Sequence, residues 1–409
     1  MKPQKSNPFS RKISVALATP ILVLLALAAV SLYDFNFADR YQYIRRASSA
    51  SSFPETTSSS PTIPAATLPS SSSSASPANS SSSSSATNSS ATDACDLTRG
   101  QWVPDDEPPY YTNLTCPFID DLQNCMKFGK PGLDLMPWRR KPDGCDLPRF
   151  EAGRFLEAMR GKSMAFVGDS LARNHVKSLL CILSQVAEPV ELVATTETDV
   201  TGRAANLSNA APGLGLWDVH LDTRDARWAA HIAEFDYLVM SGTYWFFRPC
   251  VYHEGGRATP VSGAVRAAFR TALGAIAARE GFRGKAVVRT VTPVHFENGE
   301  WNTGGDCVRT RPFRRGERAR NALVAEFRAA QVDALRETEA ASRRNQNGAE
   351  LRLLDITEAM ELRPDGHPSR YGHPPGGSVE GSFVVDCLHW CLPGPIDMWS
   401  ELLFHMLAE

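Results

Sequence analysis

The stretch Lys162–Ser170 places the strongest constraint on how this chain can fold. The short apolar run Met164–Val167 leads directly into Gly168-Asp169-Ser170, and a helical pattern starts at Leu171. A strand that ends in a sharp turn and opens a helix presents a serine hydroxyl to its surroundings. Because such a hydroxyl is inert at its own pKa, it becomes a nucleophile only beside a base that a third group orients. The segment predicts an α/β core with Ser170 as candidate nucleophile.

The region near the C-terminus supplies a base together with its orienting group. Asp386 lies three residues before His389, so its carboxylate reaches the Nδ1–H of the imidazole within one turn and leaves Nε2 to accept the serine proton. Gly-Asp-Ser and Asp-x-x-His each occur by chance in many chains. Their joint presence predicts a catalytic set of Ser170, His389 and Asp386.

Further short blocks around these motifs carry a resemblance to one known family. In chain order they are Cys95-Asp96, Tyr110-Tyr111-Thr112-Asn113, Asn124-Cys125, Trp138-Arg139, Cys145-Asp146-Leu147-Pro148, Gly168-Asp169-Ser170 and Asp386-Cys387-Leu388-His389-Trp390-Cys391-Leu392-Pro393-Gly394. From about Cys95 to the C-terminus the chain resembles the plant trichome birefringence-like proteins, which acetylate wall polysaccharides. The resemblance implies an SGNH/GDSL-hydrolase-like core and O-acetyl transfer through Ser170, Asp386 and His389.

Short apolar runs alternate with longer amphipathic ones after Pro148. The expected strands are Met164–Val167, Tyr237–Met240, Ala286–Val291 and Leu351–Ile356, and the expected helices are Leu171–Ser184, Val261–Glu280 and Arg315–Arg344. Such β-α alternation predicts a mainly parallel sheet with flanking helices. In these sheets the reactive residues gather beyond the carboxyl ends of the strands, which is where Ser170 and Gly242 would lie.

Composition divides the chain into an N-terminal tail and a globular part. Residues 47–93 are almost entirely Ser, Ala, Thr and Pro and have little to bury, which is typical of a disordered stem. Residues 94–150 are rich in aromatic residues, Pro and Cys, and have little periodicity. We expect a cytosolic tail at 1–12, a transmembrane signal anchor at 13–33, a stem at 34–93, a Cys-rich cap at 94–150 and a catalytic domain at 151–409.

The uncharged run Ile13–Tyr33 is long enough to cross a bilayer, which needs about 20 helical residues. Basic residues flank it on both sides, so they orient it only slightly. The cysteines and the glycosylation sequons at Asn79, Asn88, Asn113 and Asn206 place the rest of the chain on the lumenal side. A single-pass type II membrane protein follows, and the resemblance implies the Golgi membrane. A cleaved signal peptide is the alternative, because Ala26-Leu27-Ala28 resembles a cleavage site.

Charge and cysteine content restrict the partners and the redox state. The net charge is only −2 and the basic residues are scattered, so a nucleic-acid partner is not expected; no protein partner is indicated. Eight of the nine cysteines would suffice for four disulfides, and counting leaves their connectivity open. Cys387 and Cys391 flank His389 as in a zinc cluster, but the secretory context favours disulfides, and we expect no metal.

The resemblance implies a specific disulfide pattern. It pairs Cys95 with Cys145, Cys116 with Cys181, Cys125 with Cys391 and Cys307 with Cys387, with Cys250 outside the four pairs. Two of these bonds would tie the loop that carries Asp386 and His389 to distant parts of the chain. At about 2–4 kcal/mol each, they would hold the base and its orienting carboxylate in place.

Donors for an oxyanion come from the Ser170 turn and from its neighbours. The candidates are the backbone N–H of Ser170, the side chain of Asn174 one helical turn later, and the backbone of Gly242. Tyr244 and Trp245 are candidates for stacking on sugar rings. Their sequence neighbourhood departs from the Gly-x-Asn-Asp block of SGNH enzymes.

Two further histidines compete for the role of base. His295 follows an expected strand and heads a polar loop, and we expect it to be a substrate contact or a plain surface residue. His175 lies on the helix that Ser170 opens, and packing is its expected role.

The residues alone leave the acyl acceptor open, because hydrolysis and transfer share the same acyl-serine intermediate. The resemblance favours transfer of acetyl, from acetyl-CoA or a relay molecule that is a co-substrate and not a bound cofactor, to a cell-wall polysaccharide. Xyloglucan is the expected acceptor, with mannan or xylan as alternatives. A polysaccharide acetylesterase and a non-catalytic polysaccharide binder are the other two hypotheses.

Overall fold

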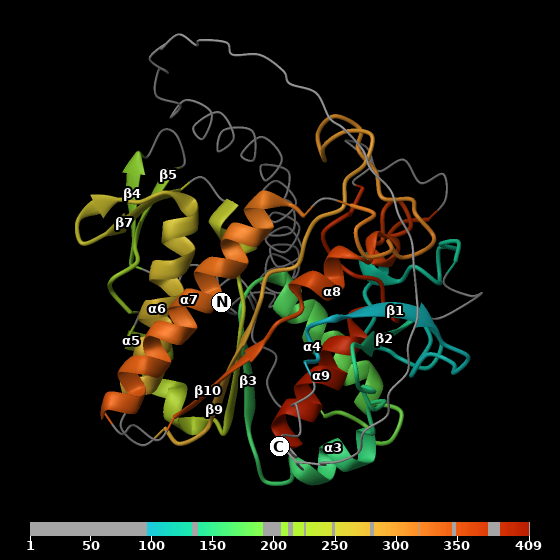
Figure 1. The fold of residues 1–409 in the computed structure, drawn as a ribbon, viewed down its shortest axis with the longest axis horizontal. Helices are drawn as coiled ribbons and strands as arrows, with labels where there is room; N and C mark the ends of the chain where they lie inside the picture. Colours follow the sequence, from blue (N-terminus) through green and yellow to red (C-terminus); the bar gives the residue numbers. More distant parts are fainter. Residues whose placement is uncertain are drawn as a thin grey trace, which may run out of the picture.

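A four-stranded parallel sheet forms the centre of the molecule (Figure 1). The computed structural model describes residues 96–408 except 133–137, 191–205, 212–215, 225, 248–249, 279–281, 319, 346–348 and 375–384. The sheet contains β3 (Met164–Val167), β6 (Tyr237–Met240), β9 (Lys285–Arg289) and β10 (Glu350–Leu354), in the order β10-β9-β6-β3. Every neighbouring pair is parallel. The predicted strands and the α/β fold class are therefore confirmed.

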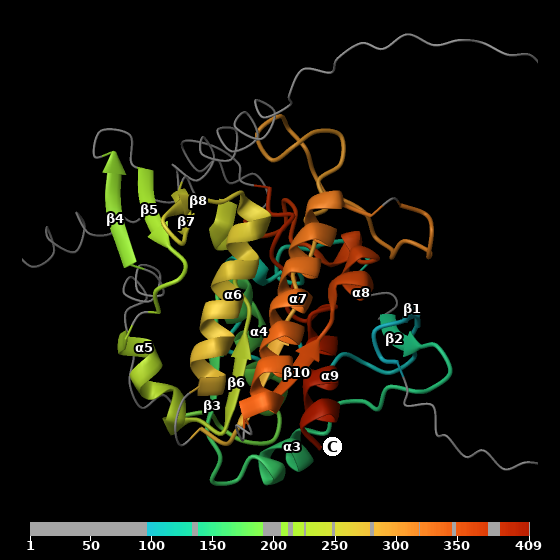
Figure 2. The same cartoon turned by 60° about the vertical axis from the view of Figure 1, so that its left-hand side comes forward.

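The side chains of the central strands alternate between two helical layers. Leu238 and Val288 join the core beneath α6 (Val261–Ala278) and α7 (Ala322–Asn345). Val239 and Val287 point the other way, into the core beneath α4 (Ser170–Leu183) and α9 (Asp397–Ala408). Burial on both faces is what a parallel sheet requires. Figure 2 shows α6 and α7 side by side on one face of this sheet.

The remaining α-helices of the described residues are short. They are α3 (Ala152–Ala158), α5 (Ala226–His231) and α8 (Thr357–Glu361). The helix expected at Arg315–Arg344 begins later, at Ala322, because the Asn321 side chain accepts hydrogen bonds from the N–H groups of Leu323 and Val324 and caps the first turn.

Two small sheets were not predicted from the sequence. The first pairs β1 (Gly100–Pro104) with β2 (Trp138–Pro142). The second, in the order β4-β5-β7-β8, contains β4 (Asn206–Ala211), β5 (Leu216–His220), β7 (Cys250–Glu254) and β8 (Arg257–Ala258). It lies beside one end of α6 in Figure 2.

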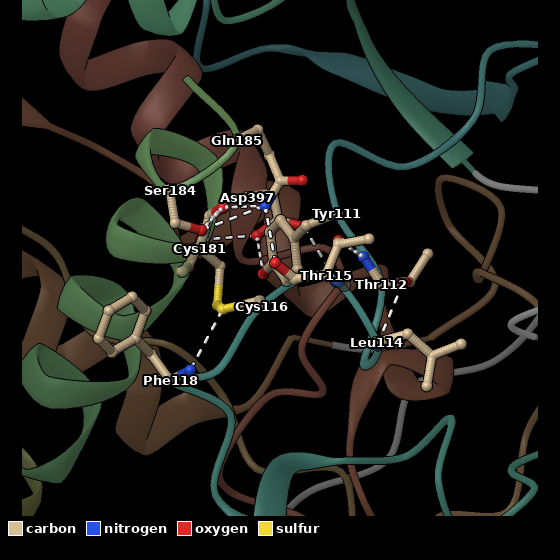
Figure 3. The surroundings of a disulfide bond; sticks show 12 residues. Tyr111, Thr112, Leu114, Thr115, Cys116, Phe118, Cys181, Ser184, Gln185 and Asp397 are labelled. Carbon is tan, nitrogen blue, oxygen red and sulfur yellow. Dashed lines mark hydrogen bonds between the residues drawn. A yellow bond between two sulfur atoms is a disulfide. The ribbon is translucent and has the colours of Figure 1, made fainter. Parts of the chain in front are cut away.

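The N-terminal Cys-rich segment shares the core under α4 and α9. Trp102 and Tyr111 are buried in that core, and the indole of Trp102 donates to the carbonyl of Ala359 in α8. A disulfide joins Cys116 of this segment to Cys181 of α4 (Figure 3). The segment is therefore joined to the rest of the described structure by apolar packing as well as by a covalent bond.

The expected tail, anchor and stem lie outside the described residues. Among the residues that are described, no helix is both long and apolar enough to cross a bilayer.

Candidate active site

Ser170 lies where β3 passes into α4, at the carboxyl edge of the sheet. The Asp169 side chain caps the helix by accepting from the N–H of Leu171, and its second oxygen accepts from the N–H of Tyr244 beyond β6. One buried carboxylate therefore joins the Ser170 turn to the next loop. Sequence reasoning placed this aspartate in the turn and assigned it no such role.

The two loops approach each other at a pair of glycines. A Cβ on Gly168 would lie 2.5 Å from the Ser241 Oγ, and Gly242 has a φ of +126° with its Cβ position 3.4 Å from the Gly168 Cα. A side chain at Gly168 would crowd Ser241 and Ala172, and the positive φ of Gly242 favours glycine there. The Gly242 backbone thus lies next to the Ser170 turn, as an oxyanion donor must, and that role stays a prediction.

Ser170, His389 and Asp386 form a continuous hydrogen-bonded chain. The Ser170 Oγ lies 2.7 Å from His389 Nε2, and His389 Nδ1 lies 2.8 Å from the Asp386 Oδ2. The other oxygen of Asp386 accepts from the N–H groups of Leu388 and His389, each at 2.9 Å. This is the geometry of a general base that can take the serine proton.

The charges of the site are set by burial and by this pairing. Burial would raise the pKa of Asp386, but the His389 charge and the hydrogen bonds from His389 and Leu388 hold it well below its usual range. Burial likewise opposes the charge on His389, yet Asp386 outweighs it and raises the pKa of the imidazole above 6.5. The base is therefore strengthened by its orienting carboxylate.

The segment 386–392 is attached to its surroundings at almost every residue. Disulfides join Cys387 to Cys307 and Cys391 to Cys125. Asp386 exchanges two backbone hydrogen bonds with Ser369, and further backbone bonds run from Cys391 to Gly366 and from Leu392 to Gln123. The base and its carboxylate therefore lie on a loop that is fixed from several directions.

Three of the expected disulfide pairings are present: Cys116–Cys181, Cys125–Cys391 and Cys307–Cys387. Cys145 is also disulfide-bonded, while Cys95 lies outside the described residues.

Asn174 is not an oxyanion donor, which corrects the sequence-based expectation. Its side chain is fully buried; the Oδ1 accepts from the N–H of Trp390 at 2.8 Å and the Nδ2 donates to the carbonyl of Trp390 at 3.2 Å. An amide with this environment cannot reach a substrate oxygen. Asn174 instead fixes the residue that follows His389.

His295 is also not a substrate contact or a surface residue. Its side chain is 1% exposed and lies between the His367 ring and the carbonyl of Glu361. His367, which sequence reasoning did not single out, contacts the carbonyl of His389. His175 packs between Phe166 and Trp399, as predicted.

The remaining candidates are two aromatic residues and the glycosylation sequons. Tyr244 and Trp245 follow Gly242 and are partly exposed, and the Tyr244 hydroxyl donates to the carbonyl of Thr292. Of the sequons, Asn113 lies in a turn and is partly exposed, and Asn206 begins β4. Asn79 and Asn88 lie outside the described residues. Sugar stacking and glycosylation stay predictions.

Comparison with known proteins agrees with this fold. Residues 147–210 and 203–406 match the PC-Esterase family, described as a GDSL/SGNH-like acyl-esterase family found in Pmr5 and Cas1p. Residues 93–146 match the PMR5 N-terminal domain. The two matches meet at residues 146 and 147.

Individual relatives cover most of the chain. Protein trichome birefringence-like 20 of Arabidopsis thaliana is 42% identical over 347 residues, which are 77% of this chain and 72% of that protein. Xyloglucan O-acetyltransferase 4 of Populus trichocarpa is 39% identical over 352 residues, 78% of this chain and 82% of that protein. Xyloglucan O-acetyltransferase 2 of Arabidopsis thaliana is 36% identical over 352 residues, which are 77% of this chain and 83% of that protein. This chain therefore belongs to the trichome birefringence-like family, with an SGNH-like PC-Esterase domain behind its PMR5 N-terminal domain.

Proposed function

We propose that this protein is a polysaccharide O-acetyltransferase that transfers acetyl by way of an acetyl-serine at Ser170. The observation that supports it most is the hydrogen-bonded chain from the Ser170 Oγ through His389 to Asp386, at 2.7 and 2.8 Å. A serine in this geometry can lose its proton as it attacks an acyl carbon.

In the first half-reaction, the Ser170 Oγ attacks the acetyl carbonyl of the donor and His389 Nε2 takes the hydroxyl proton. The backbone N–H groups of Ser170 and Gly242 stabilise the oxyanion, a contribution worth about 100- to 1,000-fold in rate for each donor. The donor group then leaves with the proton from His389. The donor, acetyl-CoA or a relay molecule, is a co-substrate.

In the second half-reaction, His389 takes the proton of a sugar hydroxyl as that oxygen attacks the acetyl-serine. The Ser170 oxygen leaves and recovers the proton from His389. Water can replace the sugar hydroxyl, and the enzyme would then act as an acetylesterase. Transfer is favoured here because several relatives are named acetyltransferases.

Xyloglucan is the proposed acceptor. Three of the relatives that cover most of this chain are named xyloglucan O-acetyltransferases. A neutral glycan also suits a chain with a net charge of only −2. The aromatic residues Tyr244 and Trp245, beyond β6, are candidates for the sugar contacts.

We further propose that the enzyme is a type II protein of the Golgi membrane, anchored through residues 13–33 with its catalytic domain in the lumen. The apolar run before the Ser-rich stem supports the anchor. The disulfides support the lumen, because such bonds persist in oxidising compartments.

Mass spectrometry of defined acceptors tests the proposed activity. The protein and its Ser170→Ala variant are incubated with an acetyl donor and with deacetylated xyloglucan, mannan or xylan oligosaccharides. We expect acetyl on xyloglucan alone, absent with the variant. Acetyl gained only on mannan or xylan would refute the proposed acceptor. Ser170-dependent release of acetate from acetylated polymers, without any gain, would refute transfer and support the esterase.

A further inference from the structure

Two buried histidines form a hydrogen-bonded chain that ends on the catalytic loop. The His295 Nε2 lies 3.0 Å from the carbonyl oxygen of Glu361, the His295 Nδ1 lies 2.7 Å from the His367 Nε2, and the His367 Nδ1 lies 2.7 Å from the carbonyl oxygen of His389. His295 is 1% exposed and His367 is fully buried. The chain therefore runs from one backbone carbonyl to another without access to water.

The number of protons in this chain follows from its two ends. A carbonyl oxygen only accepts hydrogen bonds, so the ring nitrogens that face Glu361 and His389 must each carry a hydrogen. A neutral imidazole has one N–H, and each of the two rings then donates its N–H to its own carbonyl. Their two inner nitrogens would face each other at 2.7 Å with lone pairs only. All three contacts are hydrogen bonds only if a third proton lies between the rings.

Some features of the surroundings disfavour a shared proton between the two rings, and others favour it. Burial disfavours the charge and acts to lower the pKa of both rings. Asp386 and Asp365 act against this effect, and the Trp390 ring stacks on His367 with the ring centroids 4.0 Å apart, a face that attracts cations. The charged groups that act on the pair or belong to the elements packed against it are Lys130, Arg309, Arg318, Glu361, Arg363, Asp365 and Asp386.

The contact with His389 fixes one particular peptide unit. Its carbonyl, on His389, is held by His367, and its N–H, on Trp390, is held by Asn174. Two buried side chains from different segments thus fix the plane of the peptide that directly follows the base. Rotation of that plane would move the imidazole away from the Ser170 Oγ.

We propose that His295 and His367 share one proton, and that His367 acts through its Nδ1–H as a positioning residue that holds the backbone of His389 in the orientation that lets its side chain reach Ser170. The shared proton is a property of the fold and does not depend on the reaction. The positioning role rests on the proposed function.

Nuclear magnetic resonance of the full-length chain with ¹⁵N-labelled histidine rings tests the shared proton. At pH 7 we expect one proton resonance coupled to a nitrogen of each of two rings. The resonance remains in Ser170→Ala and disappears in His295→Asn, whose neutral amide donates to His367 without an added charge. Two neutral rings with no shared proton in the unmutated protein would overturn the proposal, whatever the variants do.

Steady-state kinetics tests the positioning role with a matched pair. The amide of His367→Asn can still donate to the His389 carbonyl, whereas the ring of His367→Phe cannot. We expect His367→Phe to lower kcat about 100-fold with KM unchanged, as about 1 Å of misplacement does, and His367→Asn to keep at least about a tenth of kcat. Equal losses in both variants would refute positioning. If no acetyl transfer is found at all, the proposed function fails while the resonance still decides the shared proton.

Discussion

Replacement of Asn174 by leucine distinguishes a structural role, in which the side chain holds the backbone of Trp390, from the role of an oxyanion donor. The side chain is fully buried and holds both the N–H and the carbonyl of Trp390, at 2.8 and 3.2 Å. Leucine has nearly the same shape and no polar atoms, so Asn174→Leu leaves two buried backbone groups without partners.

The size of the effect follows from those two groups. A buried polar group without a partner costs about 1–3 kcal/mol, so the free energy of unfolding should fall by about 2–6 kcal/mol. That is a large part of the roughly 5–15 kcal/mol that stabilises a typical domain. The protein that still folds should lose about 100-fold in kcat, because Trp390 directly follows His389 and a 1 Å displacement of a catalytic group costs about that much.

Urea unfolding and steady-state kinetics, measured on the same preparation, distinguish the two roles. Asn321→Ala is the control, because it removes an asparagine that bonds two backbone N–H groups at the first turn of α7. The control should lose about 1 kcal/mol and keep its kcat. If Asn174→Leu unfolds like the unmutated protein and still loses about 100- to 1,000-fold in kcat, Asn174 is an oxyanion donor and our assignment is wrong.

Three other perturbations have definite expected outcomes. The pKa of His389 is raised above 6.5 by Asp386, so kcat/KM should rise with pH to a midpoint above 6.5, and Asp386→Asn should lower both the rate and the midpoint; an unchanged midpoint would contradict the pairing. Burial raises the pKa of Glu401 to about 7, so the folded protein holds a proton that the unfolded chain releases near pH 4.5, and the melting temperature should fall from about pH 5 to about pH 8. Glu401→Gln should reduce that fall, and an equal fall in both proteins would exclude Glu401 as its source. Cys387→Ser and Cys391→Ser should each lower secreted yield and kcat, whereas normal values in both would show that the disulfides do not position the base.

The central sheet was predictable because its strands are short, apolar and separated by amphipathic helices. Met164–Val167 and Tyr237–Met240 were predicted with the bounds that β3 and β6 have. Both are covered on both faces, so local pattern and tertiary environment favour the same structure. The second sheet was missed because β5 and β7 contain charged and histidine residues, which hide the usual strand pattern.

Within the site, the sequence indicated the three residues that form the hydrogen-bonded chain, but the roles it suggested for two of their neighbours were wrong. The spacing of Asp386 and His389 fixes a contact within one turn, so the pair was visible in the sequence. Asn174 and His295 were misjudged because their partners, the backbone of Trp390 and the ring of His367, are distant in the chain. Side chains that bond distant backbone groups leave no periodic signal.

A search for the acetyl-serine itself tests the proposed mechanism. The protein is mixed with an acetyl donor in the absence of acceptor, quenched in acid, digested and analysed by mass spectrometry. We expect one acetyl group on Ser170, which disappears when xyloglucan oligosaccharide is added before the quench. Transfer to the oligosaccharide at the unmutated rate by Ser170→Ala would contradict the mechanism.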